Sequence, residues 1–186
     1  MDCEGLWISP REPFYGTYVY SFFLKDIGLL IDPTNLSPQQ ISQWPHPLTT
    51  VWFTHYHKTI SFKVKSILDK LKVSYHRYPS TYPTLSNIRV IPFPGHTSDS
   101  IIVQWKHDDH VHLFTGDSLY GTNDYGLRIT YEFSENIPLL KSNLESLKTL
   151  ESVTHVHPSV GPYSTIKFKD KKHWIIQLQR AINQRH

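Results

Sequence analysis

The sequence predicts one layered α/β domain, and three observations lead to that fold class. Runs of Val, Ile, Phe and Tyr, which are typical of strands, alternate with segments whose apolar residues recur at helical spacing. A length of 186 residues suits one domain with its own core, and we find no linker, repeat or low-complexity segment. Several strand-like runs also end in residues able to bind metal. We therefore expect a single domain over residues 1–186 with a site at its strand ends.

The first part of the chain predicts two strands and a short helix. Residues 15–24 and 27–33 have strand composition, and a turn joins them. Ser37 is a good helix N-cap and Pro38 suits the first helical position, while Pro45 and Pro47 close the helix. We interpret Asp32, at the end of the second strand, as a turn former or structural acid, with a supporting role at a site as the alternative.

The most informative stretch is residues 51–60, where an apolar strand ends in two histidines. His55 and His57 are two residues apart, so in extended chain both imidazoles can point to one side, as a pair of metal ligands must. Residues 61–72 follow with apolar residues at helical spacing, which places the histidines in the turn between a strand and a helix. The alternative interpretation is two surface histidines in a loop.

Further strands are expected at residues 73–77, 88–93, 101–105, 111–115 and 153–156. His96 follows the second of these runs and Asp117 follows the fourth, each directly after a glycine. Helices are expected from Ser134, as N-cap, to about residue 150, and over residues 169–185. We interpret the apolar stripes of both helices as core-facing surfaces.

Composition excludes several function classes. A net charge of +3 is too small to indicate a nucleic-acid partner, and no apolar run is long enough to span a membrane. The single cysteine, Cys3, excludes an internal disulfide and a cysteine-based zinc site, and it favours a reducing, cytoplasmic location. The first residues lack the features of a signal peptide. The unusual feature is a total of 12 histidines.

Three motifs, in order, resemble those of the metallo-β-lactamase superfamily, and glyoxalase II-like hydrolases in particular. They are Thr54-His55-Tyr56-His57, Pro94-Gly95-His96-Thr97 and Phe114-Thr115-Gly116-Asp117. The resemblance covers roughly residues 15–162 and implies an αββα sandwich, two mixed β-sheets flanked by helices, with a metal site at one edge. It also implies that His55, His57 and His96 are the histidines of the first metal site. Asp117 matches the carboxylate that bridges two metals.

The residues of the family's second metal site are missing. The motif aspartate falls on Thr59, the last motif histidine on Ile60, and the late histidine on Val160. The resemblance therefore implies one metal ion, for which zinc is the first choice and iron or manganese the alternatives. His157 and Asp99 are candidate substitute ligands, because each lies a few residues from a motif position.

Two functions follow from this pattern. The first is a hydrolase of a small ester, thioester or lactone, in which water on one zinc ion is the nucleophile and Asp117 is a ligand or orienting acid. The second is a catalytically inactive protein of the same fold that binds a ligand or a protein, because Thr59 cannot act as a base. The small net charge argues against a nucleic-acid-processing enzyme. The substrate and the oligomeric state stay open.

The main interpretation of five other histidines and three tyrosines gives them no role at the metal site. We expect His107, His110 and His112 to be solvated around a hairpin turn. His155 and His157 alternate on a strand, so we interpret them as a hydrogen-bonded surface pair. The loops expected to select the substrate are residues 122–132 and 163–168. The tyrosines expected to pack rather than to line a pocket are Tyr120, Tyr125 and Tyr131.

Overall fold

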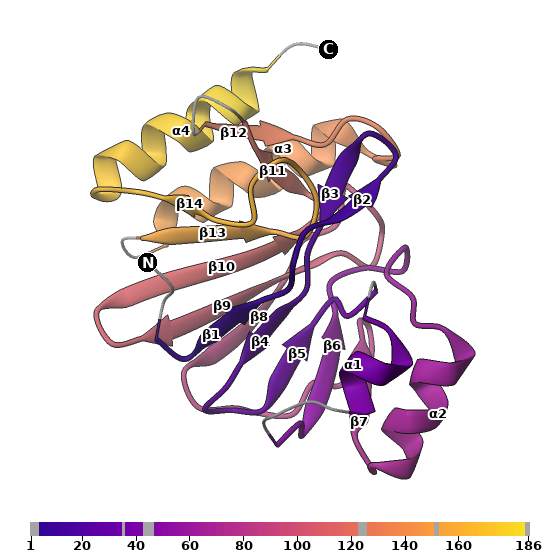
Figure 1. The fold of residues 1–186 in the computed structure, drawn as a ribbon. Helices are drawn as coiled ribbons and strands as arrows, with labels where there is room; N and C mark the ends of the chain where they lie inside the picture. The colour runs from indigo at the N-terminus through magenta and orange to yellow at the C-terminus, as the bar shows by residue number, and fades with distance from the viewer. Residues whose placement is uncertain (1–3, 35, 43–46, 123–125, 151–152, 185–186) are drawn as a thin grey trace.

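The computed structural model describes residues 4–34, 36–42, 47–122, 126–150 and 153–184. Cys3, Pro45 and Tyr125, on which three of the sequence predictions rest, lie outside these residues. Within the described part, two five-stranded sheets pack face to face, and helices cover the outer face of each (Figure 1). Both sheets contain parallel and antiparallel pairs, so the expected αββα sandwich of two mixed sheets is confirmed.

The first sheet has the strand order β1-β4-β5-β6-β7. β4 is antiparallel to both neighbours, whereas β6 is parallel to both of its own. Helices α1 (Pro38–Ser42) and α2 (Phe62–Lys70) cover the outer face of this sheet (Figure 1). Its strands are β1 (Leu6–Ile8), β4 (Phe22–Leu24), β5 (Leu29–Ile31), β6 (Thr50–Phe53) and β7 (Ser74–Arg77).

The second sheet has the strand order β14-β13-β10-β9-β8, and only β10 and β13 are parallel. Helices α3 (Ile137–Ser146) and α4 (Lys171–Asn183) lie on its outer face (Figure 1). None of the helices in the described residues is long and apolar enough to cross a membrane. The strands are β8 (Ile88–Pro92), β9 (Ile101–His107), β10 (His110–Gly116), β13 (His155–Pro158) and β14 (Ile166–Lys167).

The core forms three layers because strand residues alternate between the two faces of each sheet. In β4, Phe22 and Leu24 point between the sheets, whereas Phe23 packs under α1 and α2. The middle layer joins such residues to Phe114 and others from the second sheet, and a third layer lies beneath α3 and α4. The apolar stripes of the helices therefore are core, as predicted.

The N-terminal part contains one more hairpin than the sequence predicts. The single strand expected over residues 15–24 is divided into β3 (Thr17–Val19) and β4, and β3 pairs with β2 (Glu12–Phe14). The reason is local, because Tyr15 and Gly16 both have positive φ and form the hairpin turn. Four further short strands were also not predicted, namely β1, β14, β11 (Leu119–Gly121) and β12 (Leu127–Ile129).

The helix expected from Ser134 begins later. Its N-cap is Asn136, whose side chain accepts from the backbone N–H of Leu139, and the helix ends at Ser146 before a 3-10 turn at Leu147–Thr149. Ser134 has a different role, at the candidate metal centre described below. The strand expected at residues 153–156 is shifted by two residues and runs over β13.

The predictions for His112, His155 and His157 were wrong. His112, expected to be solvated, is fully buried, and His155 and His157, expected at the surface, are also buried. Because β10 and β13 run side by side in parallel, they place all three rings together. Of the other two histidines expected to be solvated, His110 is exposed and His107 is half-buried.

Candidate metal centre

Three histidines from two strand ends converge at one edge of the sandwich. One ring nitrogen from each of His55, His57 and His96 lies within 4.8 Å of the other two. The three rings stand nearly perpendicular to one another, at interplanar angles of 81°, 86° and 89°. No other group of three potential ligands of this kind occurs in the described residues. This histidine triad has the ligand set of a three-imidazole metal site.

Thr54 determines which nitrogen of His55 carries the proton. The Thr54 hydroxyl lies 2.6 Å from Oδ2 of Asp32, and it donates there because a carboxylate only accepts. The same oxygen lies 3.0 Å from Nδ1 of His55 and must accept from it. The ring proton of His55 is therefore on Nδ1. Nε2 keeps its lone pair, and it is buried without a hydrogen-bond partner.

Ser134 determines in the same way which nitrogen of His96 carries the proton. The Ser134 hydroxyl donates to the carbonyl of Thr130 and lies 3.0 Å from Nδ1 of His96, which must donate to it. Nε2 of His96 is again buried and without a partner. Each such orphaned atom costs about 1–3 kcal/mol, and a metal ion bound at both would remove that cost. The residues present therefore fit a metal ion.

The protonation state of the triad also suits metal binding. Burial lowers the pKa of His96 to about 4. Desolvation and the neighbouring His55 lower the pKa of His57 as well. Both rings are thus neutral at pH 7, which is the form that binds metal. His55 and His96 are buried whereas His57 is exposed, so the triad faces solvent on the His57 side.

Asp32 contacts the centre indirectly, through Thr54. It is buried, and it accepts from the Thr54 backbone N–H at 2.8 Å and from the Ser159 hydroxyl at 2.5 Å, besides the Thr54 hydroxyl. Its φ of 50° turns the chain at the end of β5. Asp32 is therefore a structural acid, as interpreted from the sequence, but one whose contact orients a predicted metal ligand through Thr54.

Asp117 borders the triad and forms an ion pair with a lysine. Its Oδ2 lies 3.3 Å from Nε2 of His55, and its Oδ1 lies 2.8 Å from Nζ of Lys58. Burial opposes ionisation of Asp117, but the Lys58 ammonium outweighs burial and holds its pKa well below the ordinary value. Asp117 is therefore a carboxylate beside the triad.

The two candidate substitute ligands, Asp99 and His157, have other partners in the structure. Asp99 accepts from the backbone N–H of Tyr56 at 3.1 Å and from the Thr97 hydroxyl at 2.7 Å, so it ties together the two loops that carry the ligands. In His157 both ring nitrogens are engaged, Nε2 with His112 at 2.9 Å and Nδ1 with Thr165 at 3.1 Å. Neither side chain joins the group of three histidines.

Two glycines let the loops approach closely enough to form the centre. Gly116, with a φ of 55°, lies against Thr54, and a Cβ there would come within 2.3 Å of the Thr54 hydroxyl. Gly95, with a φ of 141°, lies against Leu140 of α3, and a Cβ would come within 2.6 Å of that residue. Any larger residue would push apart the segments that position His55 and His96.

The positions where the family's second-site residues would stand do not supply ligands. Thr59 is exposed, and Ile60 packs into the core layer beneath α1 and α2. Val160 lines a cavity of about 410 Å³ together with Tyr120 and Tyr131, which were expected only to pack. The end of the predicted loop 122–132 contributes to this cavity, whereas residues 163–168 do not.

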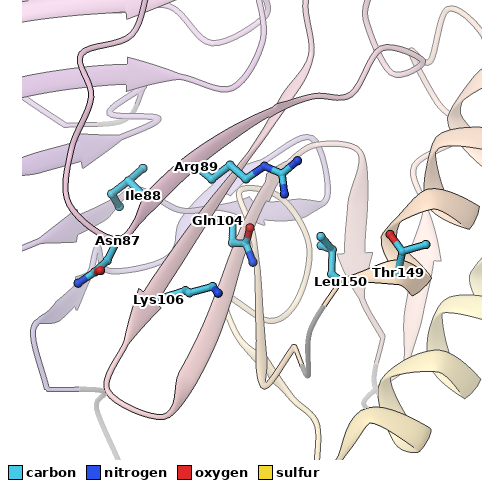
Figure 2. Close-up of a pocket in the computed structure, with 7 residues that line it drawn as sticks. All are labelled: Asn87, Ile88, Arg89, Gln104, Lys106, Thr149 and Leu150. Atoms are coloured by element: carbon cyan, nitrogen blue, oxygen red, sulfur yellow. The ribbon is translucent and has the colours of Figure 1, made fainter.

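A second cavity, of about 350 Å³, lies on the second sheet away from these residues. Figure 2 shows Arg89, Gln104 and Lys106 along its wall, with Thr149 and Leu150 opposite. None of the histidines of the triad lines it, so we do not assign it to the metal centre.

Sequence reasoning gave no role at the metal centre to Thr54, Ser134 or Lys58. Thr54 and Lys58 stand inside the quoted histidine stretch, and a lysine beside metal-ligand positions was a signal that could have been used. Ser134 gave a misleading signal, because a serine before an apolar helical stripe indicates an N-cap. Its contact with His96 joins residues 38 positions apart, which local patterns do not reveal.

Comparisons with known proteins bear on the fold. No protein-family profile and no curated protein sequence matches the chain. Among solved structures, it is similar to a metallo-β-lactamase from Staphylococcus aureus subsp. aureus COL, with a TM-score of 0.65 and 17% identity over 100% of this chain. The chain spans 65% of the length of that protein.

Two further solved structures are similar to this chain over most of its length. FIM-1, a metallo-β-lactamase from Pseudomonas aeruginosa solved in its mono-zinc form, has a TM-score of 0.66 and 15% identity, covering 99% of this chain and 95% of its own. ETHE1 from Myxococcus xanthus has a TM-score of 0.56 and 20% identity, covering 91% and 81%. This chain therefore has the fold of the metallo-β-lactamase superfamily.

Proposed function

We propose that the protein is a hydrolase that uses one zinc ion to cleave a small ester, thioester or lactone. The observation that carries the proposal is the pair of buried Nε2 atoms of His55 and His96, neither of which has a hydrogen-bond partner, with His57 beside them at the solvent side. A zinc ion held by three imidazoles lowers the pKa of its bound water to about 7. The likeness of the motifs to those of glyoxalase II-like hydrolases supports the ester and thioester class.

The chain's own residues have distinct tasks in this proposal. Thr54 and Ser134 hold two imidazoles in the ligand tautomer and orientation. Oδ2 of Asp117 lies beside the triad, where it would accept a hydrogen bond from a water bound there. Lys58 holds the other oxygen and so limits rotation of the carboxylate. The mono-zinc form of the similarly folded FIM-1 supports a single ion.

The cavity lined by Tyr120, Tyr131 and Val160 is our candidate for the substrate pocket. Its volume of about 410 Å³ lies within the range of small-molecule sites. Its wall is linked to the triad, because Thr130 and Tyr131 belong to the turn whose Ser134 contacts His96. A mostly apolar substrate group of modest size fits this lining.

The metal and the compartment are part of the proposal. Imidazole ligands suit zinc and iron better than manganese, which prefers oxygen ligands, so zinc is our first choice. A cytoplasmic location fits a chain with a single cysteine.

The test is hydrolysis of a panel of thioesters, aryl esters and lactones by the zinc-loaded protein, with Asp117→Asn as the matched variant. We expect zinc-dependent turnover, and a loss of about 10²–10⁴-fold in kcat in the variant, since one positioned base or orienting group contributes that much. Bound zinc must be measured in the same samples. Turnover that persists without zinc, or is equal in the variant, would contradict the proposal.

The second candidate is a catalytically inactive protein that binds a ligand or a protein partner. A specific observation favours it, because Thr59 is exposed and Ile60 packs against the core layer, where the family's motif has an aspartate and a histidine. This alternative predicts full zinc binding without turnover on any member of the panel. Replacement of His96 by Ala would then remove the metal and change no activity.

A further inference from the structure

Lys58 is a buried cation at the candidate metal centre. Only 4% of the residue is exposed, and its ammonium lies 2.8 Å from Oδ1 of Asp117. Lysine is rarely buried this completely unless it is paired. Its neighbours in the sequence, His55 and His57, are predicted metal ligands. The Lys58 ammonium is therefore a positive charge beside a predicted site for a metal cation.

The two oxygens of Asp117 face different partners. Oδ2 points to Nε2 of His55, and Oδ1 points to the Lys58 ammonium. A carboxylate that bridges two metals also has one cation at each oxygen. In this chain, Oδ1 of Asp117 already has a cation beside it, the Lys58 ammonium.

The backbone around Lys58 explains why this side chain turns inward. The Lys58 N–H donates to the carbonyl of His55 at 3.1 Å, and Arg77 donates to the carbonyl of Lys58. Beyond Lys58, Thr59 is exposed and Ile60 packs into the core layer beneath α2. The Lys58 side chain therefore lies against Asp117, whereas Thr59 is at the surface and Ile60 packs against the core layer.

We propose that the Lys58 ammonium takes the place of a second metal ion, and so restricts the centre to one metal. This inference rests on the proposed function and deepens it. A second divalent cation at Asp117 would have to displace the ammonium and would lie against its charge. Lys58 is thus a positioning residue, which acts on the metal number and on the orientation of Asp117.

The test is a zinc titration of metal-free protein, read by bound zinc per chain and by thermal unfolding. Wild type and Lys58→Arg, which keeps the charge, should bind one ion, with a Tm that stops rising after one equivalent. Lys58→Met, which removes the charge at similar length, should unfold about 10 °C lower without metal, because Asp117 loses its partner. In excess zinc the Tm of Lys58→Met should keep rising past one equivalent, because Oδ1 of Asp117 is then open to a weakly bound second cation.

The double variant Lys58→Met with Asp117→Asn is the second readout. Because both charges are gone, it should fold, bind one ion and unfold near the wild-type temperature, even if Lys58→Met alone does not fold. The inference is overturned if Lys58→Met saturates at one equivalent as wild type does, if wild type binds two ions, or if the double variant is as unstable as the single one. A wild type that binds no zinc contradicts the proposed function, and the inference falls with it.

Discussion

In the described part of the chain, two groups of three histidines differ in the angles between their rings and in the hydrogen bonding of their ring nitrogens. In the triad, the rings stand at 81° to 89° to one another. In the second group, the histidine stack of His112, His155 and His157, the rings are parallel, with interplanar angles of 9° or less. Parallel rings lie face to face and do not turn three nitrogens toward one point.

The ring nitrogens show the same contrast. In the stack, both ring nitrogens of His157 have hydrogen-bond partners, His112 and Thr165, and Nδ1 of His155 contacts the Thr154 hydroxyl. The triad instead leaves Nε2 of His55 and Nε2 of His96 buried and without a hydrogen-bond partner. Histidine count therefore does not identify a site, whereas an orphaned lone pair and the angle between rings do.

The largest effect we predict separates the two groups by metal affinity. His96→Ala removes one of three ligands and should weaken zinc binding by more than about 100-fold, beyond the loss typical of residues that only orient ligands. His157→Ala should keep one zinc per chain but lower the free energy of unfolding by about 3 kcal/mol, through a cavity and an unpaired His112. Equilibrium dialysis and urea unfolding measure both. Equal zinc affinity in wild type and His96→Ala would contradict the assignment of the triad.

The second prediction concerns acid stability of the metal-free protein. Burial lowers the pKa of His112 to about 3 and that of His155 to about 4. Between pH 6.5 and about 4 the unfolded chain therefore binds protons that the folded stack does not, so stability falls as the pH falls. The loss for His155 alone should be about 3 kcal/mol at pH 4.

The matched control for that prediction is His155→Phe, which keeps a ring but removes the titrating group. Urea unfolding at several pH values should give a shallower decline in this variant than in wild type. Identical pH dependence in the two proteins would show that the stack does not resist protonation.

Whether a contact could be predicted from the sequence depends on how many residues separate its partners along the chain. The strand ends that carry His55, His96 and Asp117 could be predicted, because apolar runs, glycines and helix caps are local signals. The stack could not, because it depends on the parallel pairing of β10 with β13, elements more than 40 residues apart. Asp32, Ser134 and Lys58 likewise act through tertiary contacts that no spacing rule encodes.

The third prediction tests the tautomer argument. Ser134→Ala removes the acceptor at Nδ1 of His96 and should weaken zinc binding by about 10–100-fold, with one ion still bound at saturation. Thr54→Val should do the same through His55. Competition with a chromophoric chelator measures both. Unchanged affinity in both variants would mean that these hydroxyls do not orient the ligands.

The smallest effect should come from Asp99→Asn. The amide oxygen can still accept from the Tyr56 N–H and the Thr97 hydroxyl, so the two loops should keep their positions. We expect zinc affinity within about 3-fold of wild type, far less than the change for a lost ligand. A loss as large as that of His96→Ala would instead identify Asp99 as a metal ligand.

The central claim is that three histidines bind one metal ion, and X-ray absorption at the zinc edge tests it most directly. Zinc-loaded wild type should show three imidazole nitrogens at about 2.0–2.1 Å, with His55→Ala showing fewer imidazoles or no zinc. No metal–metal distance near 3.5–4 Å should be seen. Fewer than three imidazoles in wild type, or a second metal at that distance, would contradict the account.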